Sequence, residues 1–255
     1  MNFIISATTD IGLVKETNQD SLSVKVLSTP QGKMVFAVLC DGMGGLSKGE
    51  VASGTLVTAF NDWVLNRLPA LCQAPLQDHE IREEWEQLVI RQNQSIQAYG
   101  AKLGVSLGTT AVVLLLTQTR YYILNVGDSR AYEITDTLRQ LTNDQTLVAR
   151  EVALGHITEE QAHTDPRRSV LLQCIGASPQ VYPDMFFGQI RQNAVYMLCS
   201  DGFRHEISPA EIFDSFRPER LLSDGDMQNQ ALGLIDLNKR RGERDNISVA
   251  LVRTF

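Results

Sequence analysis

The chain has 255 residues, of which 43% are hydrophobic and 21% are charged, values typical of a globular protein with one large core. Its formal net charge is −7 and it has no long run of lysine or arginine, which argues against partners such as nucleic acids or anionic membranes. The first residues carry no basic leader, and the longest apolar run, residues 111–116, is far too short to span a bilayer, so we expect a cytoplasmic protein.

Short apolar or alternating runs predict the strands. In chain order they lie at residues 3–7, 21–27, 34–40, 110–116, 120–126, 130–134, 194–200 and 247–253. The links at 117–119 and 127–129 are too short to hold a crossover helix, so the strands that they join are expected to be antiparallel.

Helical spacing of apolar residues predicts helices between these strands. The first begins at Ser47, which would form a capping box with Glu50, and the others cover residues 79–103, 208–216 and 226–241. Strands grouped apart from helices are typical of an α+β domain in which helices cover antiparallel sheets. Residues 145–185 combine charged residues and prolines with no strong strand, which predicts a mobile insertion within a single domain.

Aspartates recur where the predicted strands end or begin. Four stand directly after a strand or shortly before one: Asp41, Asp128, Asp201 and Asp245. In antiparallel neighbours the end of one strand adjoins the start of the next, so Asp201 and Asp245 are expected to face each other at one rim of a sheet. Each aspartate alone would be interpreted as a turn residue or helix cap. Four carboxylates in phase would repel one another unless protons or cations neutralise them, and we predict a cation site.

The expected ligands are oxygen atoms, because none of the four histidines stands at these strand ends. Oxygen ligands favour Mg²⁺ or Mn²⁺ over zinc. Two such ions roughly 3.5 to 4 Å apart would share a bridging water, lower its pKa and align the oxygens of an in-line phosphoryl displacement. Asp41 would then bridge the two ions, and Gly42, which lacks a side chain, would let its backbone carbonyl approach them.

Other polar residues near these strand ends have structural interpretations. Arg130 is expected to form a structural ion pair with a carboxylate. Lys15 and Asp20, near the start of the chain, are weak signals by themselves, typical of a solvated lysine and of a loop that leads into a strand. Hydrogen-bonding or turn roles are predicted for Asn125, Asn246, Ser129 and Ser200.

The motifs DIGLVKETNQDS, VLCDGMGG, GTTAVV, NVGDSRAY, LTNDQTLV, LCSDG and RDNISV occur in this order from near the start of the chain to near its end. With them the chain resembles the type 2C metal-dependent protein serine/threonine phosphatases, the PPM family, in their bacterial form. The resemblance implies a four-layer α-β-β-α sandwich whose two antiparallel sheets hold a binuclear metal site at one end. It also implies that residues from Gln145 to about 185 form a flap beside the active site.

The resemblance further implies individual roles at the matching positions. Asp41 would bridge both metal ions, and the Gly42 carbonyl would be a backbone ligand. The remaining direct ligands of one ion would be Asp201 and Asp245. Asp20 matches a position that holds metal-bound water. Asp128 matches one that helps to bind a third, weaker metal ion.

Three positions depart from the family pattern. Lys15 replaces the arginine that binds phosphate, which keeps the charge but loses the planar bidentate fork. Met43 stands where eukaryotic relatives have a histidine that is a candidate general acid. The flap begins with NDQT where an Asp-His is usual, so Gln145 removes an ionisable group at its start.

The predicted function is hydrolysis of phosphoserine and phosphothreonine in proteins by a metal-bridging hydroxide that attacks phosphorus directly. Asp41 and Lys15 would be the catalytic residues, Lys15 would bind the substrate phosphate, and targets of a bacterial serine/threonine kinase are expected among the substrates. The cofactor would be two Mn²⁺ or Mg²⁺ ions, with a third bound weakly. A catalytically weak relative that binds phosphoproteins is the alternative. A P-loop enzyme is excluded because DGMGGLSKGE lacks the GxxxxGK[ST] spacing.

Overall fold

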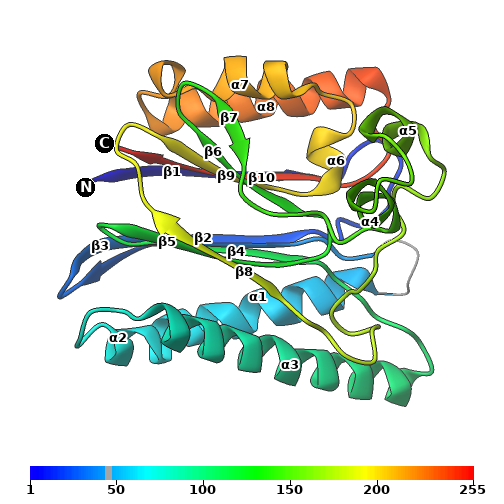
Figure 1. Cartoon of the computed structure of the whole chain (residues 1–255), viewed down its shortest axis with the longest axis horizontal. Coiled ribbons are helices and arrows are strands. Elements are labelled where there is room, and N and C mark those ends of the chain that lie inside the picture. Colours follow the sequence, from blue (N-terminus) through cyan, green and yellow to red (C-terminus); the bar gives the residue numbers. More distant parts are fainter. Residues whose placement is uncertain (44–47) are drawn as a thin grey trace.

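The two sheets of the predicted sandwich lie face to face (Figure 1). The computed structural model describes residues 1–43 and 48–255, and within these ranges ten strands form two five-stranded antiparallel sheets. The first sheet has the order β1 (Phe3–Asp10), β10 (Ile247–Thr254), β9 (Val195–Cys199), β6 (Arg130–Ile134) and β7 (Leu138–Gln140). The second has the order β2 (Ser21–Thr29), β3 (Gly32–Cys40), β4 (Ala111–Leu116), β5 (Arg120–Val126) and β8 (Asp184–Gln189).

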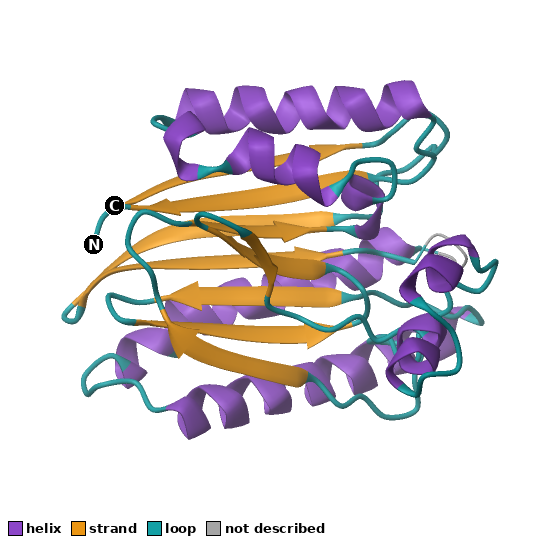
Figure 2. Cartoon of the chain, turned by 45° about the horizontal axis from the view of Figure 1, so that its top comes forward, coloured by secondary structure: helices purple, strands orange, loops and turns teal. Residues whose placement is uncertain are grey.

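Helices cover the outer face of each sheet, and in a tilted view the strands run roughly along the long helices (Figure 2). The second sheet is covered by α1 (Gly49–Asn66), α2 (Leu68–Leu71) and α3 (Asp78–Leu103). The first is covered by α7 (Pro209–Phe216), a 3-10 helix (Pro218–Arg220) and α8 (Asp224–Arg241). Three short helices gather at one end of the sandwich: α4 (Leu147–Ala153), α5 (Glu159–Thr164) and α6 (Asp201–Arg204). The α+β, four-layer prediction is confirmed.

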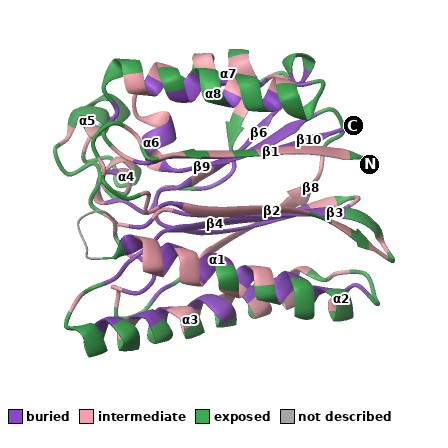
Figure 3. Ribbon diagram, turned by 180° about the vertical axis from the view of Figure 1, so that it is seen from behind, coloured by how far each residue is buried: buried purple, intermediate pink, exposed green. Residues whose placement is uncertain are grey.

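Alternation along β3 shows how the layers are held together. Val35 and Leu39 belong to the apolar layer between the two sheets, whereas Phe36 points to the helical side and packs against Trp63 and Trp85. All seven residues from 34 to 40 are fully buried, because β3 is central in its sheet and both of its faces are covered. Figure 3 shows that the buried residues lie on the inner faces of the helices and in the central strands, whereas the edge strands β1 and β2 are mainly of intermediate burial. The end of β3 is therefore packed on both faces.

The structure differs from the sequence-based expectations in a few elements. β7 and β8 were not predicted, and β8 begins at Asp184, inside the segment expected to lack a strand. The first helix begins at Gly49, with Lys48 in a left-handed conformation before it, and the predicted start at Ser47 lies outside the described residues. Within the described ranges, no helix has the length and hydrophobicity needed to cross a membrane.

Candidate metal centre and active site

Strand register brings the predicted aspartates to one end of the sandwich. Ser21 of β2 pairs with Cys40 of β3, which sets Asp20 beside Asp41. In the first sheet Cys199 of β9 faces both Arg130 of β6 and Val249 of β10. The residues that leave or enter these strands therefore meet at one edge. We call this group the acidic rim: Asp20, Asp41, Asp128, Asp201 and Asp245.

The turn that carries Asp128 connects the two sheets, because β5 belongs to the second sheet and β6 to the first. Gly127 adopts a positive φ of +104° in this turn, and a Cβ there would lie only 2.6 Å from Cγ2 of Thr110. Only glycine fits both the conformation and the space without strain. The chain can therefore pass from one sheet to the other at the rim and leave Asp128 buried there.

The carboxylates of the acidic rim influence one another electrostatically. Partial burial and the negative charges of Asp20, Asp201, Asp128 and Asp245 raise the pKa of Asp41 well above its usual value. Burial, together with Asp201 and Asp245, raises the pKa of Asp20 to about 7, although the nearby hydroxyl groups of Ser248 and Ser200 act in the opposite direction. For a carboxylic acid such a shift means that the ionised form lacks compensation.

The Asp128 carboxyl is also buried near negative charge, but a neighbouring arginine offsets part of this effect. Burial and the charge of Asp201 raise the pKa of Asp128 to about 7, although the Arg204 guanidinium acts in the opposite direction. Arg204 donates from Nη2 to the backbone carbonyl of Asp128 at 2.9 Å, and the same nitrogen lies 3.6 Å from Asp128 Oδ2. Arg204 therefore offsets part of the negative charge at this side of the rim.

Unpartnered oxygen atoms test whether the rim suits a cation. Among the described residues, both carboxylate oxygens of Asp20 and Oδ1 of Asp201 are buried and have no hydrogen-bonding partner. Buried carboxylate oxygens are costly unless a proton or a cation meets them, and oxygen donors of this kind suit Mg²⁺ or Mn²⁺. The donor set thus fits a hard divalent ion. As the side chains stand, no three histidine, cysteine, aspartate or glutamate residues in 1–43 and 48–255 are close enough to share one ion.

Lys15 supplies a cation within the acidic rim. Its Nζ lies 2.7 Å from Oδ1 of Asp245, and both side chains are partly exposed. Burial alone would lower the pKa of Lys15, but the hydrogen bond to Asp245 and the charges of Asp41 and Asp201 raise it above its usual value. Lys15 is therefore a charged member of the site, and the interpretation as a merely solvated lysine is wrong.

Close backbone packing explains the glycine after Asp41. A Cβ at Gly42 would lie 2.5 Å from the carbonyl oxygens of both Gln19 and Gly49. The Gly42 amide donates to the Gln19 carbonyl at 3.1 Å, which ties the end of β3 to the chain before Asp20. No larger residue would allow this approach.

The predicted supporting contacts are present. Arg130 forms a two-pronged ion pair with Asp144 at 2.8 and 2.7 Å, as expected of a structural arginine. Asn246 accepts a hydrogen bond from the Gln19 amide at 2.9 Å, and Asn125 donates to the Gly127 and Asn143 carbonyls. Hydroxyl oxygens complete the set, at Ser129 with Thr110 and at Ser200 with the Ser248 amide.

Three residues beside the rim were missed in the sequence: Arg204, His205 and Glu243. His205 Nε2 lies 3.5 Å from Asp201 Oδ2, although no histidine was expected near these carboxylates. The sequence signal for Arg204 and His205 is their spacing from Asp201. Residues three and four positions after Asp201 lie on the same side of a helical turn as Asp201, but the sequence was interpreted as a strand end at this point.

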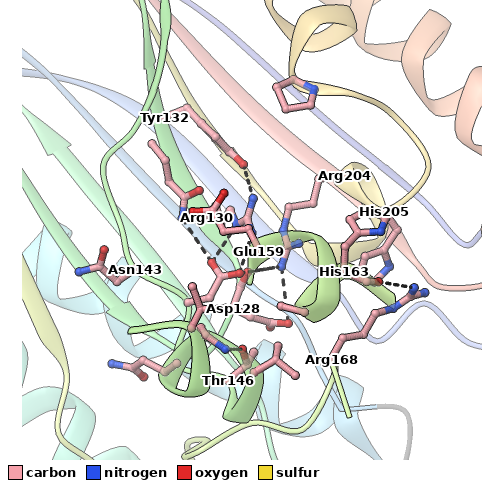
Figure 4. A pocket seen from close by; sticks show the side chains of 18 of the residues that line it. Asp128, Arg130, Tyr132, Asn143, Thr146, Glu159, His163, Arg168, Arg204 and His205 are labelled. Atoms are coloured by element: carbon pink, nitrogen blue, oxygen red, sulfur yellow. Dashed lines mark hydrogen bonds and ion pairs between the residues drawn. The ribbon is translucent and has the colours of Figure 1, made fainter. Parts of the chain in front are cut away.

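A cleft of about 1160 Å³ opens beside Asp128, between residues 145–185, the predicted flap, and the body of the protein. Val148 and Arg168 line it from the flap, and Arg130, Arg204 and Ile212 line it from the body. Figure 4 shows Arg130, Tyr132, Asp128 and Arg204 gathered on one wall, with Arg168 across from them. The cleft is large enough for a ligand segment to reach the rim from the flap side.

Comparisons with known proteins agree on one family. The sequence model of protein phosphatase 2C matches residues 14–232. The serine/threonine phosphatase stp of Listeria innocua is 33% identical over 249 residues, which cover 96% of this chain and 93% of that protein. A solved serine/threonine phosphatase of S. agalactiae has a TM-score of 0.83 at 30% identity and covers 100% of both chains. The catalytic domain of PstP, solved with 2 manganese ions, has a TM-score of 0.77 at 28% identity, with coverage of 98% and 97%.

Proposed function

The chain belongs to the protein phosphatase 2C family and is a protein serine/threonine phosphatase, and we propose that its activity depends on divalent metal ions held at the acidic rim. The observation that carries this proposal is the set of buried carboxylate oxygens on Asp20 and Asp201, which have no partner among the described residues. The PstP catalytic domain, which binds two manganese ions, supports it.

The proposed ligands follow the predicted roles. Asp41 would bind both metal ions, and the Gly42 carbonyl would be a further ligand. Asp201 and Asp245 would supply the remaining direct ligands of one ion. Asp20 would act through water, and Asp128 would help to hold a third, weaker ion. When bound, Mn²⁺ or Mg²⁺ would supply an activated water for direct attack on phosphorus and positive charge for the phosphoryl oxygens.

The chain's own residues would bind and orient the substrate. Lys15 would hold the phosphate of phosphoserine or phosphothreonine as a point charge, because its ammonium group lies within the rim. Met43 carries no proton to donate to the leaving group. A cysteine nucleophile is disfavoured because Cys40 and Cys199 are buried in strands, and burial raises the pKa of Cys199 to about 12.

The whole of residues 1–255 is proposed to act as one catalytic domain, with residues 145–185 as the flap that guides phosphoprotein substrates. Substrates would include the targets of a bacterial serine/threonine kinase. A phosphoprotein-binding role with weak catalysis is the second candidate. It is motivated by Lys15, whose ammonium group is already paired with Asp245. Normal turnover of a phosphothreonine peptide with Mn²⁺ would remove it.

Replacement of Asp41 by asparagine tests the proposed function most directly. We expect Mn²⁺-dependent hydrolysis of p-nitrophenyl phosphate and of phosphothreonine peptides to fall by roughly 100-fold or more, since a ligand shared by both ions would lose its charge. Chelation of Mn²⁺ should abolish wild-type activity, and phosphotyrosine peptides should be poor substrates.

Asp10→Asn is the matched control, because Asp10 also stands at a strand end but pairs with Lys239 at 3.0 Å. This variant should keep the wild-type rate. Retained activity in Asp41→Asn, or activity that survives the chelator in the wild type, would contradict a metal-dependent mechanism at this rim.

A further inference from the structure

Glu243 fixes the backbone that carries Asp245. Its side chain is almost completely buried, with 6% of its surface exposed. Oε1 accepts hydrogen bonds from two consecutive backbone amides, Arg244 at 2.7 Å and Asp245 at 2.8 Å. A single carboxylate oxygen thus sets the direction of the chain immediately before Asp245 and the start of β10.

The other oxygen of Glu243 faces α6. Oε2 lies 3.4 Å from Nδ1 of His205, and on the opposite side of the ring Nε2 lies 3.5 Å from Oδ2 of Asp201. The imidazole therefore spans the gap between the Glu243 and Asp201 carboxylates. Asp201, the first residue of α6, and the backbone of Asp245, in the loop before β10, are thereby connected through one continuous set of contacts.

Backbone packing holds the two segments together. A Cβ at Gly202 of α6 would lie 2.2 Å from the Asn246 carbonyl and 3.2 Å from Cβ of Asp245. On the other side of α6, Asn238 donates to the Phe203 carbonyl at 2.8 Å. Small movements of α6 or of the loop would therefore change the separation of Asp201 and Asp245 directly.

We infer that Glu243 and His205 are positioning residues that fix the segments carrying Asp201 and Asp245 relative to each other and thereby raise the affinity of the acidic rim for a divalent ion. This inference rests on the proposed metal-dependent function. Neither residue is placed as a ligand or as a catalytic group. Preorganised ligands bind metal more tightly because less order must be created on binding, and residues behind the ligands typically change metal affinity by about 10- to 100-fold.

Mn²⁺ binding by the full chain, measured by isothermal titration calorimetry without substrate, tests this role. Glu243→Ala should bind Mn²⁺ about tenfold more weakly than the wild type or worse, because the two amides lose their acceptor. Glu243→Gln keeps a carbonyl oxygen for these amides and should restore most of the affinity. His205→Ala should weaken binding less than Glu243→Ala, because its contacts are longer. At saturating Mn²⁺ the KM for p-nitrophenyl phosphate should stay near the wild-type value in all three variants.

Glu211→Ala is the matched control. Glu211 also accepts a hydrogen bond from a backbone amide, that of Ser208 at 2.8 Å, and pairs with Arg241, which keeps a second bond to the Glu206 carbonyl. This variant should melt at a lower temperature but bind Mn²⁺ within about twofold of the wild type. Equal loss of Mn²⁺ affinity in Glu211→Ala and Glu243→Ala, or unchanged affinity in Glu243→Ala, would overturn the inference alone. A wild-type chain that binds no Mn²⁺ would overturn the proposed function as well.

Discussion

The acidic rim and the start of residues 145–185, which we call the flap root, lie at the same end of the sandwich. Their buried polar groups differ in whether they have hydrogen-bonding partners. At the rim, both oxygens of Asp20 are buried without a partner among the described residues. At the flap root, the buried Gln145 side chain uses both of its polar atoms. Its oxygen accepts from the Gly127 amide and from Gln173, and its nitrogen donates to Asp184, each at 2.9 Å.

The difference indicates what each region is for. A satisfied amide costs little to bury and fixes one conformation, so Gln145 anchors the flap to the turn that carries Asp128. Unpaired carboxylates destabilise the folded chain and persist where a ligand compensates them. The absence of an ionisable group at position 145 is thus explained by anchoring, while the chemistry is concentrated at the rim.

Asp20→Asn should have the largest effect on stability. Burial and the charges of Asp201 and Asp245 raise the pKa of Asp20 from 3.8 to about 7. The folded chain therefore keeps a proton that the unfolded chain has released. The stabilisation from this group is complete below about pH 4 and is lost as the pH rises through about 7. Such a shift corresponds to at most roughly 4 kcal/mol, shared with the neighbouring carboxylates.

Urea unfolding of the metal-free protein at pH 5 and pH 8 measures this effect. The difference in free energy of unfolding between Asp20→Asn and the wild type should favour the variant more at pH 8 than at pH 5, by roughly 2 to 4 kcal/mol. Comparison of two pH values cancels any cost of the buried amide that does not depend on pH. Mn²⁺ at pH 8 should stabilise the wild type more than the variant. Equal pH dependence of the two proteins would show that folding does not raise the pKa of the Asp20 carboxyl.

Gln145→Glu should have the next largest effect, because it makes the flap root resemble the rim. The new carboxylate would face Asp184 at the present hydrogen-bonding distance, and the donor to Asp184 would be lost. We expect a loss of about 2 kcal/mol at pH 8, with a smaller loss at pH 5 where a shared proton can restore the bond. Urea unfolding and limited proteolysis of the flap would measure it.

Gln145→Met is the control for this variant, since it keeps the length of the side chain without adding a charge. It should lose stability equally at both pH values. If Gln145→Glu is as stable at pH 8 as the wild type, the amide contacts do not anchor the flap.

The fold could largely be predicted because its long elements repeat a clear pattern. The runs that became β3, β4 and β5 are mostly apolar, as expected of strands covered on both faces. β7 and β8 escaped for physical reasons. β7 has three residues, and β8 lies at a sheet edge after a proline-containing segment, where alternation is weak. Edge strands depend on the partner strand more than on their own sequence.

The site could be predicted in part for a similar reason. Strand ends predicted four aspartates of the rim, Asp41, Asp128, Asp201 and Asp245, whereas Asp20 was placed only through the family resemblance. The contacts of His205 and Glu243 depend on how α6 packs against the loop before β10, which no local pattern encodes. The pairing of Lys15 with Asp245 joins the two ends of the chain and likewise depends on the complete fold.

Lys15→Met should have the smallest effect of these substitutions, a change in Mn²⁺ affinity. The direction of this change distinguishes two roles of Lys15. Lys15 holds the Asp245 carboxylate at 2.7 Å and adds positive charge near Asp41 and Asp201, so it competes with a divalent ion for these groups. Because the pair is partly exposed, its removal should tighten Mn²⁺ binding by only about two- to fivefold, equivalent to roughly 0.5 to 1 kcal/mol. Inhibition by inorganic phosphate should weaken at the same time.

Lys15→Arg sharpens this test, because it keeps the charge and adds a planar fork for phosphate. Phosphate should then inhibit more strongly than in the wild type, with Mn²⁺ affinity nearly unchanged. Calorimetry with Mn²⁺ and phosphate inhibition of hydrolysis provide the two measurements. Weaker Mn²⁺ binding by Lys15→Met would mean that Lys15 supports the metal ligands by orienting Asp245 and does not compete with the ion. At the acidic rim, as at the flap root, a fixed contact would then matter more than an unpaired charge.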